Sequence, residues 1–444
     1  MSFSSIQAYR GFVIDAPRRG ELRAIRDGAL LVEDGVILDC GEYSRLRHLP
    51  EADGILWQNS PLNLLLPGLI DLHTHLPQYP AIARQESALL PWLEKHIFPL
   101  EKDFSPAVAK KQAPLFFNDL ARGGTTTASI FTNILKESTE VCFDAAAKSG
   151  MRIIMGKMMM DRSSYGSLAP EKILSRSVAE TRSLCETWHG YDRGRIDYAV
   201  SPRFAVTCTA ELMREAAKIA QEFDCYIQTH LSENLSEIQL VKKLFPEWPD
   251  YTSVYAECGL LTSKTLLGHA IHLTPQEIEK IQAAHAVIVH CPSSNLFLKS
   301  GIMPLDRWQD ANISLGIGSD VAAGPELNLW RVLRAALEAQ VARSFYEEVR
   351  IPSLGELFYL ITQGAAEAIG KGDLIGTLTP GKEADFIVLD IRKLLPDTGK
   401  LSFQDDLSAN DILSLLIHRA DKETTIESFV HGRSVYRSSQ NELF

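Results

Sequence analysis

The chain has 444 residues, 45% of them hydrophobic and 23% charged, a composition typical of a globular protein with one large domain and a smaller one. Its formal net charge of -11 argues against a nucleic-acid partner, because phosphate binding draws its affinity from clustered Lys and Arg. The sequence starts without a secretory signal pattern and no segment is apolar enough to span a bilayer, so we expect a cytoplasmic protein with no membrane partner.

The first clear element in chain order is a β-hairpin. Residues Ala29–Gly41 alternate apolar and polar side chains around Asp34-Gly35, a dipeptide that favours a tight turn. Strand-like patterns return near the C-terminus, in Ala384–Leu389 and in Ser428–Arg437. We therefore expect the two chain ends to share one small β-sheet domain.

Between these regions, short apolar segments alternate with longer segments of helical periodicity, which indicates parallel β/α architecture. Eight segments are predicted as strands: Gly68–His75, Thr125–Phe131, Arg152–Met159, Ile196–Pro202, Cys225–His230, Thr265–Ala270, Ala286–His290 and Ile313–Asp320. Helices are predicted between them, for example at Ala210–Phe223, Leu235–Phe245 and Pro275–Ala284. This pattern predicts an α/β fold with a (β/α)8 TIM-type barrel at 67–377, and a small β-sandwich domain built from residues 1–66 and 378–444.

The seven cysteines are scattered and nowhere form a C-x-x-C pair. We expect reduced thiols packed in the interior. A metal site in this chain therefore requires ligands other than paired cysteines.

The sharpest local feature is the segment PGLIDLHTH, an apolar strand that ends in His73 and His75. Residues two apart in a strand lie on the same face, so the two imidazoles point the same way. Barrel enzymes assemble their sites at the carboxyl ends of the strands, where two such ligands can bind one metal. Taken alone, an H-x-H pair is equally well explained by two unrelated or exposed histidines.

Three later strand ends also carry residues with metal or proton chemistry: His230 in QTHLSEN, His269 in LLGHAIH and Asp320 in GIGSDVAAG. All strand ends meet at the mouth of a barrel. There His73, His75, His230 and Asp320 would supply three nitrogens and one oxygen, a ligand set typical of a divalent metal that activates water. Zinc is the preferred metal and iron the alternative. The competing interpretation is a set of buried structural polar residues.

Glu233 follows His230 by three residues, where the fifth strand gives way to its loop. This position places a second carboxylate beside the metal without making it a ligand. A carboxylate there can move a proton between a metal-activated water and a ring nitrogen. The alternative is an ordinary glutamate at a helix N-terminus.

The ordered set of H-x-H, His, His and Asp, with GTLTPGKEADFIVLD near the C-terminus, is similar to the amidohydrolase superfamily. Within it, the stretches HTHLPQYP, PWLEKHIFPLE, SPRF, QTHLSEN, DYTSVY, HCPSSN and GSDVAAG resemble the guanine deaminases, over about 67–325. The resemblance implies a homodimer that binds zinc through His73, His75, His230 and Asp320. Binuclear relatives bridge two metals with a modified lysine at the end of the fourth strand. Here SPRF offers Arg203 instead, so we expect one zinc per subunit.

The activity implied by the resemblance is hydrolytic deamination of guanine to xanthine and ammonia, a step of purine catabolism or salvage. Metal-activated water adds to the ring carbon that bears the amino group, and Glu233 passes a proton to the adjacent ring nitrogen. Asp320, both ligand and base, helps protonate the departing amine. His269 acts on the attacking water or on the intermediate.

The substrate, a small-molecule purine, is expected to lie against several of these same side chains, His75, His230, Glu233 and Asp320. The resemblance assigns Gln78 to a purine edge, where its amide offers both a donor and an acceptor. Arg203 can donate to the C6 carbonyl, a group that adenine lacks, and Phe204 can shape or stack against the pocket. A structural salt bridge is the alternative role for Arg203.

Several alternatives remain open from the sequence. Another aminated ring, such as ammeline, an oxidised purine or a cytosine-like base, would use the same metal chemistry. A metal-free scaffolding homologue is a further hypothesis, but the presence of all four predicted metal ligands argues against it. The segment with Trp92, His96 and Phe98 forms a lid or wall, or, as periodicity favours, a helix packed into the core. Core or surface roles explain His272, His285 and His290 without chemistry, and His290 is a secondary candidate only.

Overall fold

A computed structural model describes residues 6–162, 169–396 and 407–438. Its larger sheet is a parallel, nearly closed barrel whose eight main strands pair in chain order from β6 to β14. The strands are β6 (Leu69–His75), β7 (Thr125–Phe131), β8 (Arg152–Gly156), β10 (Ile196–Pro202), β11 (Tyr226–Leu231), β12 (Thr265–His269), β13 (Val287–His290) and β14 (Leu315–Ile317), and β9 (Met158–Met159) also pairs with β10. All eight predicted barrel strands are therefore present.

Two of the predicted strands differ from the structure by more than a shift of one residue at an end. The third divides at Lys157 into β8 and β9, and the eighth is only three residues long. Asp320 therefore lies in the loop after β14, where its φ of 48° is left-handed. That loop closes the barrel against β6, since the N–H of Asp320 donates to the carbonyl of His73 at 2.8 Å. The approach requires Gly318, where a Cβ would lie 2.5 Å from that of His73.

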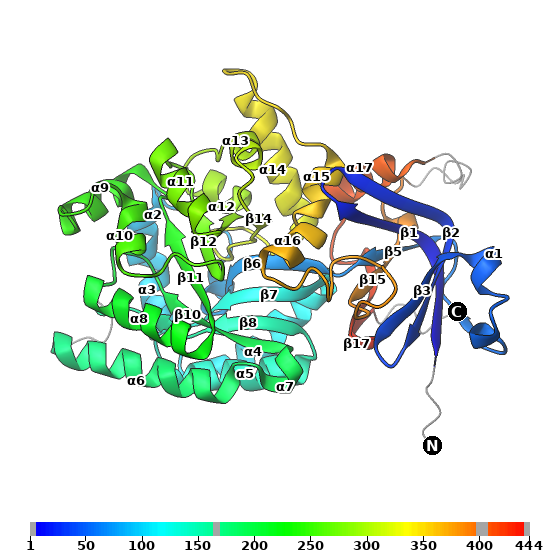
Figure 1. Cartoon of the computed structure of the whole chain (residues 1–444), viewed down its shortest axis with the longest axis horizontal. Coiled ribbons are helices and arrows are strands. Elements are labelled where there is room, and N and C mark those ends of the chain that lie inside the picture. The colour runs from blue at the N-terminus through cyan, green and yellow to red at the C-terminus, as the bar shows by residue number, and fades with distance from the viewer. Residues whose placement is uncertain (1–5, 163–168, 397–406, 439–444) are drawn as a thin grey trace.

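Helices pack around the barrel (Figure 1) and include the three predicted ones, each within one residue of its expected end. Their ends follow from capping residues: Thr209 caps α8, and Asn234 and Thr274 form capping boxes on α9 and α11. The helices of the barrel region are α2 (Leu89–Trp92), α3 (Phe98–Lys102), α4 (Pro106–Arg122), α5 (Lys136–Ser149), α6 (Pro170–Trp188), α7 (Tyr191–Gly194), α8 (Ala210–Phe223), α9 (Leu235–Leu244), α10 (Tyr251–Glu257), α11 (Pro275–Ala283), α12 (Pro292–Phe297), α13 (Leu305–Asp310), α14 (Leu329–Arg343), α15 (Leu354–Tyr359) and α16 (Gln363–Ala368).

The second sheet joins the two ends of the chain, as expected, and makes the sandwich-like part of the fold (Figure 1). Its strands are β1 (Gln7–Arg18), β2 (Glu21–Glu33), β3 (Val36–Glu42), β4 (Trp57–Gln58), β5 (Asn63–Pro67), β15 (Phe386–Asp390), β16 (Thr425–Val430) and β17 (Arg433–Arg437), with α1 (Tyr43–Leu46) and α17 (Ala409–Arg419) beside them. The predicted hairpin at Ala29–Gly41 is present, and the strand-like pattern at Ser428–Arg437 forms a second hairpin, with left-handed turns at Asp34-Gly35 and His431-Gly432. The sequence did not predict β1.

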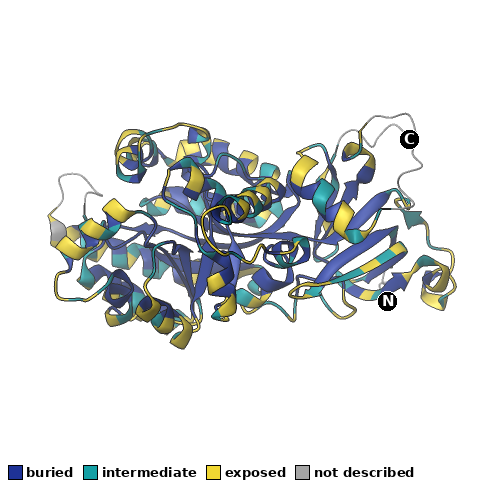
Figure 2. Ribbon diagram, turned by 90° about the horizontal axis from the view of Figure 1, so that it is seen from above, coloured by how far each residue is buried: buried dark blue, intermediate teal, exposed yellow. Residues whose placement is uncertain are grey.

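The strands of both sheets are mostly buried, and exposed residues concentrate on helices and loops (Figure 2). All seven cysteines are buried. Among the described residues, no helix combines the length and the apolar character needed to cross a bilayer.

A buried ion pair connects the start of β8 to the segment that leads into β15. Arg152, 3% exposed, donates from Nε to Asp385 at 3.1 Å and also pairs with Glu383. Asp385 in turn accepts a hydrogen bond from the N–H of His431 at 2.8 Å, and its carbonyl accepts one from Gly68. The barrel and the terminal sheet are thus tied together by one buried guanidinium.

Replacing this guanidinium by an apolar side chain, Arg152→Met, is expected to lower the free energy of unfolding by about 3–5 kcal/mol, because Asp385 is left buried without its partner. Urea denaturation followed by circular dichroism measures this. The matched control is Arg45→Met, which breaks an exposed pair with Asp39 and is expected to cost less than about 1 kcal/mol. Equal effects of the two changes would contradict the structural role of Arg152.

Candidate active site

Four buried side chains from three strand ends converge at the mouth of the barrel. The Nε2 atoms of His73 and His75 lie 3.2 Å apart, and Nε2 of His230 lies 3.3 Å from that of His75. Oδ1 of Asp320 lies 3.4 Å from His73 and 3.2 Å from His75. Ligands about 2.0–2.1 Å from a tetrahedral zinc are separated by about 3.3 Å, so these spacings fit one metal ion.

The protonation of these groups also fits a cation. Nδ1 of His230 lies 2.7 Å from the carbonyl of Arg203, which directs the lone pair of Nε2 toward the cluster. Burial lowers the pKa of His75 to about 4 and that of His230 well below its usual value, so both imidazoles are neutral. Burial opposes ionisation of Asp320, but the adjoining imidazoles of His73 and His75 lower its pKa well below the ordinary range. His75 and His230 therefore present neutral nitrogens and Asp320 a carboxylate, the forms that bind a divalent metal.

His269 and Glu233 stand beside this cluster. Nε2 of His269 lies 3.5 Å from Oε2 of Glu233 and 3.7 Å from Oδ2 of Asp320. Nδ1 of His269 lies 2.9 Å from the amide oxygen of Asn295, which orients the ring. His269 has a left-handed φ of 68°, a strained conformation for a residue with a β-carbon and one that often marks a functional position.

Glu233 is buried and holds its proton tightly. Burial and the nearby Asp320 carboxylate raise the pKa of Glu233 to about 8, although a hydrogen bond from Ser300 at 3.0 Å opposes this rise. Ser300 is itself held by His272, whose Nε2 lies 2.7 Å from its carbonyl. Two carboxyl groups of one pocket thus have opposite pKa shifts, a pattern typical of acid–base sites.

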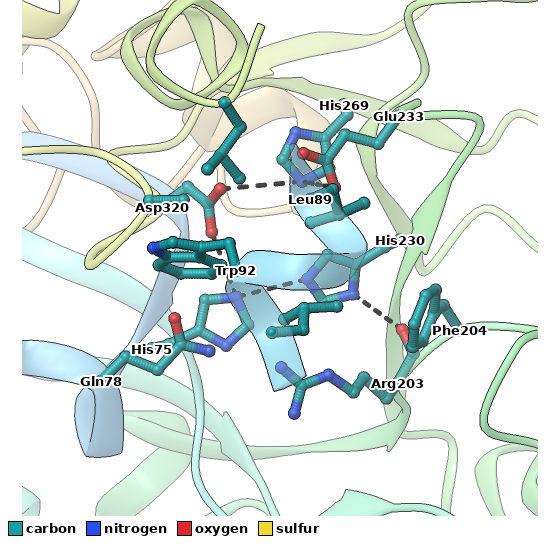
Figure 3. A pocket seen from close by; sticks show the side chains of 13 residues that line it. His75, Gln78, Leu89, Trp92, Arg203, Phe204, His230, Glu233, His269 and Asp320 are labelled. Carbon is teal, nitrogen blue, oxygen red and sulfur yellow. Dashed lines mark hydrogen bonds and ion pairs between the residues drawn. The ribbon is translucent and has the colours of Figure 1, made fainter. Parts of the chain in front are cut away.

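The pocket over the cluster is lined by residues that the sequence predicted as substrate contacts, together with apolar side chains (Figure 3). Its lining comprises His75, Gln78, Leu89, Trp92, Leu93, Arg203, Phe204, His230, Glu233, His269, Leu298, Asp320 and Ala323. His73 is the one predicted site residue absent from this lining, and it lies beneath as part of the metal cluster. The structure therefore brings all the predicted site residues together.

The segment around Trp92 satisfies both interpretations of its sequence. It is helical, running through α2, a π-helical turn η3 (Leu93–Ile97) and α3, and Trp92 is buried as a core residue would be. Trp92 also lines the pocket, so the segment forms a wall of the site. His96 and Phe98 are outside the lining, although the ring of Phe98 lies 5.1 Å from the guanidinium carbon of Arg203. π-Helical turns are frequent at functional sites.

Three polar residues around the site were not singled out in the sequence. Glu101 accepts a hydrogen bond from Gln78 at 2.9 Å and forms a buried ion pair with Arg203. Asn295 orients His269, and Ser300 contacts Glu233. Glu101 and Asn295 stand in the PWLEKHIFPLE and HCPSSN stretches, which were the available signal.

The remaining candidate histidines lie outside the pocket lining. His290 is buried, and neither of its ring nitrogens has a hydrogen-bond partner among the described residues. Burial lowers its pKa to about 3, which keeps the ring neutral. His285 has a left-handed φ of 54° in the turn before β13. Neither residue contributes to the cluster.

Comparison with known proteins agrees with this geometry. The model of the Amidohydrolase family matches residues 64–434. Guanine deaminase of Escherichia coli (strain K12) is 34% identical, over 97% of this chain and 98% of that protein. The solved E. coli guanine deaminase superposes with a TM-score of 0.89 at 33% identity, covering 98% of this chain and all of the other. Guanine deaminase from C. acetobutylicum with guanine bound in its active site gives a TM-score of 0.88 at 28% identity, covering 97% and 100%. By its sequence and its structure, the chain belongs to the amidohydrolase family.

Proposed function

We propose that this chain catalyses the hydrolytic deamination of guanine to xanthine and ammonia. The observation that carries the proposal is one pocket that combines a metal-binding cluster, the buried acid Glu233 and the polar pair Gln78 and Arg203. The similarity to guanine deaminases over nearly the whole chain, one of them with guanine bound, supports the same substrate.

The metal in this proposal is one zinc ion per subunit, with iron as the alternative, held by His73, His75, His230 and Asp320. A bound zinc ion would lower the pKa of an attacking water to about 7 and so supply a nucleophile at neutral pH. The donor spacings and the neutral imidazoles support this assignment.

The protons are handled by the three groups around the cluster. Glu233 donates its proton to the ring nitrogen next to C2 and takes one proton of the attacking water in return, which leaves a tetrahedral carbon bearing hydroxyl and amine. Asp320 transfers the hydroxyl proton to the amine, so that ammonia leaves and the C2 carbonyl of xanthine forms. His269 accepts a hydrogen bond at Nε2 and orients the water, since its other nitrogen contacts Asn295.

Substrate recognition in this proposal comes from the opposite wall. Arg203 donates to the C6 carbonyl, Gln78 binds the neighbouring ring edge, and Phe204 packs against the purine plane. Placing C2 of the substrate over the metal cluster brings the substrate into contact with His75, His230, Glu233 and Asp320. A ring without the carbonyl would leave buried donors of Arg203 unpaired, which disfavours adenine.

The proposal also covers the domain boundaries, the location of the protein and its oligomeric state. We propose a barrel domain at 67–377 and a small domain of residues 1–66 and 378–444. The chain passes directly from β5 in the terminal sheet to β6 in the barrel at Gly68, which supports the first of these boundaries. We also propose a cytoplasmic protein, from the sequence pattern, and a homodimer, from the resemblance to guanine deaminases. A deaminase of a different aminated ring would have the same metal cluster but different side chains in the pocket wall that contacts the substrate. A scaffolding homologue would bind no metal.

Metal removal tests the cluster. Chelator-treated protein is expected to lose deaminase activity and to recover it with one equivalent of zinc, because the attacking water then lacks the cation that lowers its pKa. The variant His75→Ala is expected to bind less than about a tenth of an equivalent of zinc by elemental analysis. The exposed His48→Ala serves as the control and should bind a full equivalent. Full activity in verified metal-free protein would overturn the assignment.

The change Glu233→Gln tests the proton transfer. It is expected to lower kcat for ammonia release from guanine about 10²–10⁴-fold, since an amide cannot carry the proton, while bound zinc stays at one equivalent. Xanthine formation at 1:1 with ammonia identifies the reaction. The matched control is Glu247→Gln, a change of an exposed glutamate in the loop after α9, which should leave kcat unchanged. Activity retained by Glu233→Gln would assign the shuttle elsewhere.

A further inference from the structure

One buried carboxylate joins the two side chains that are proposed to recognise the substrate. Glu101, 6% exposed, accepts a hydrogen bond at Oε1 from the amide nitrogen of Gln78 at 2.9 Å. Its other oxygen, Oε2, pairs with Nη1 of Arg203. Gln78 and Arg203 both line the pocket (Figure 3), whereas Glu101, which contacts both, is not part of the lining.

This contact decides which way the amide of Gln78 points. A carboxylate only accepts hydrogen bonds, so the nitrogen of the amide must face Glu101. The amide oxygen accepts from the N–H of Ala322 at 3.3 Å, which agrees with the same orientation. One N–H of Gln78 then remains to donate to an acceptor on a ring edge.

Arg203 is fixed by the same carboxylate. Arg203 is 2% exposed, and a buried cation requires a counter-charge. Nη1 is engaged by Glu101 and by the sulfur of Met158 at 3.0 Å. Within the described part of the chain, Nε and Nη2 donate no hydrogen bond, so these donors remain for a carbonyl oxygen in the pocket.

The backbone of Glu101 is itself anchored. Asn133, which follows β7, donates from Nδ2 to the carbonyl of Glu101 at 3.3 Å and to that of Phe104 at 3.0 Å. Ser138 donates to the same Phe104 carbonyl at 2.7 Å. Glu101 therefore sits at the fixed end of the helical segment whose other end supplies Leu89, Trp92 and Leu93 to the pocket wall.

We propose that Glu101 is a positioning residue that orients Arg203 and Gln78 to recognise a 6-oxopurine, and that it thereby sets selectivity for purines with a C6 carbonyl. The inference rests on the proposed function, because it assumes that the purine edge faces Arg203. Glu101 does not touch the substrate and transfers no proton. It acts through the direction of the donors it holds.

The test compares two ligands that cannot be deaminated, hypoxanthine, which has the C6 carbonyl, and purine, which lacks it. In zinc-loaded Glu101→Gln, an amide can accept from one partner but turns a donor toward the other. We expect the dissociation constant of hypoxanthine to rise at least about tenfold and that of purine to change less than about twofold. For guanine, KM should rise by a similar factor, with kcat within about threefold of its original value.

Two further variants separate positioning from folding. Glu94→Gln removes the same charge from an exposed position on the same segment and should change neither ligand. Glu101→Asp keeps the charge on a shorter side chain and should restore part of the affinity for hypoxanthine. If Glu101→Gln does not fold, Glu101→Asp carries the same comparison, with hypoxanthine weakened several-fold and purine unaffected.

Equal weakening of both ligands, or unchanged binding of hypoxanthine, would overturn the inference and assign Glu101 a structural role only. Melting temperature and bound zinc are measured on every variant, because a structural defect lowers both. Failure of the proposed function looks different: the unaltered protein would then release no ammonia from guanine. The two failures are therefore distinguishable in one series of measurements.

Discussion

The site depends on one electrostatic constraint: four buried donor atoms with lone pairs that face one another at 3.2–3.4 Å. With His230 committed to the carbonyl of Arg203 through Nδ1, its Nε2 has no proton to share with His75. Lone pairs so close together in a dry interior are unfavourable unless a cation lies between them. The four donors come from β6, β11 and the loop after β14, so only the closed barrel can assemble them.

The loop after β14, which closes the barrel against β6, also carries Asp320. The last strand is short, and the chain continues beside β6 through hydrogen bonds from Asp320 to His73 and from His75 to Val321. Gly318 permits the close approach, because any β-carbon there would collide with His73. The left-handed backbone of Asp320 then turns its carboxylate toward the imidazoles. The contact that closes the barrel thus also fixes the position of a metal ligand. The left-handed backbone of Asp320 lies at a functional residue, as strained backbone often does.

The sequence predicts the parts of this arrangement that follow from periodicity and strand ends. His73, His75, His230 and Asp320 could be placed together because all strand ends of a barrel meet at one face. Glu101 could not be found this way, since it lies on a helical segment where spacing predicts only core packing and its partners are 23 and 102 residues away. In β1, Gly11 and Pro17 interrupt the alternation by which strands are recognised. The conformation of Asp320 depends on contact with β6, which local sequence does not encode.

The two carboxyl groups of this pocket, Asp320 and Glu233, differ in protonation, and their surroundings explain the difference. Asp320 lies against the imidazoles of His73 and His75, which lower its pKa, and is ionised, whereas Glu233 receives a hydrogen bond from Ser300 and keeps its proton. Arg203 is a cation that lowers the pKa of Glu233, but burial and the charge of Asp320 outweigh this effect. Arg203, which forms an ion pair with Glu101, can therefore serve substrate recognition while the acid Glu233 in the same pocket stays protonated.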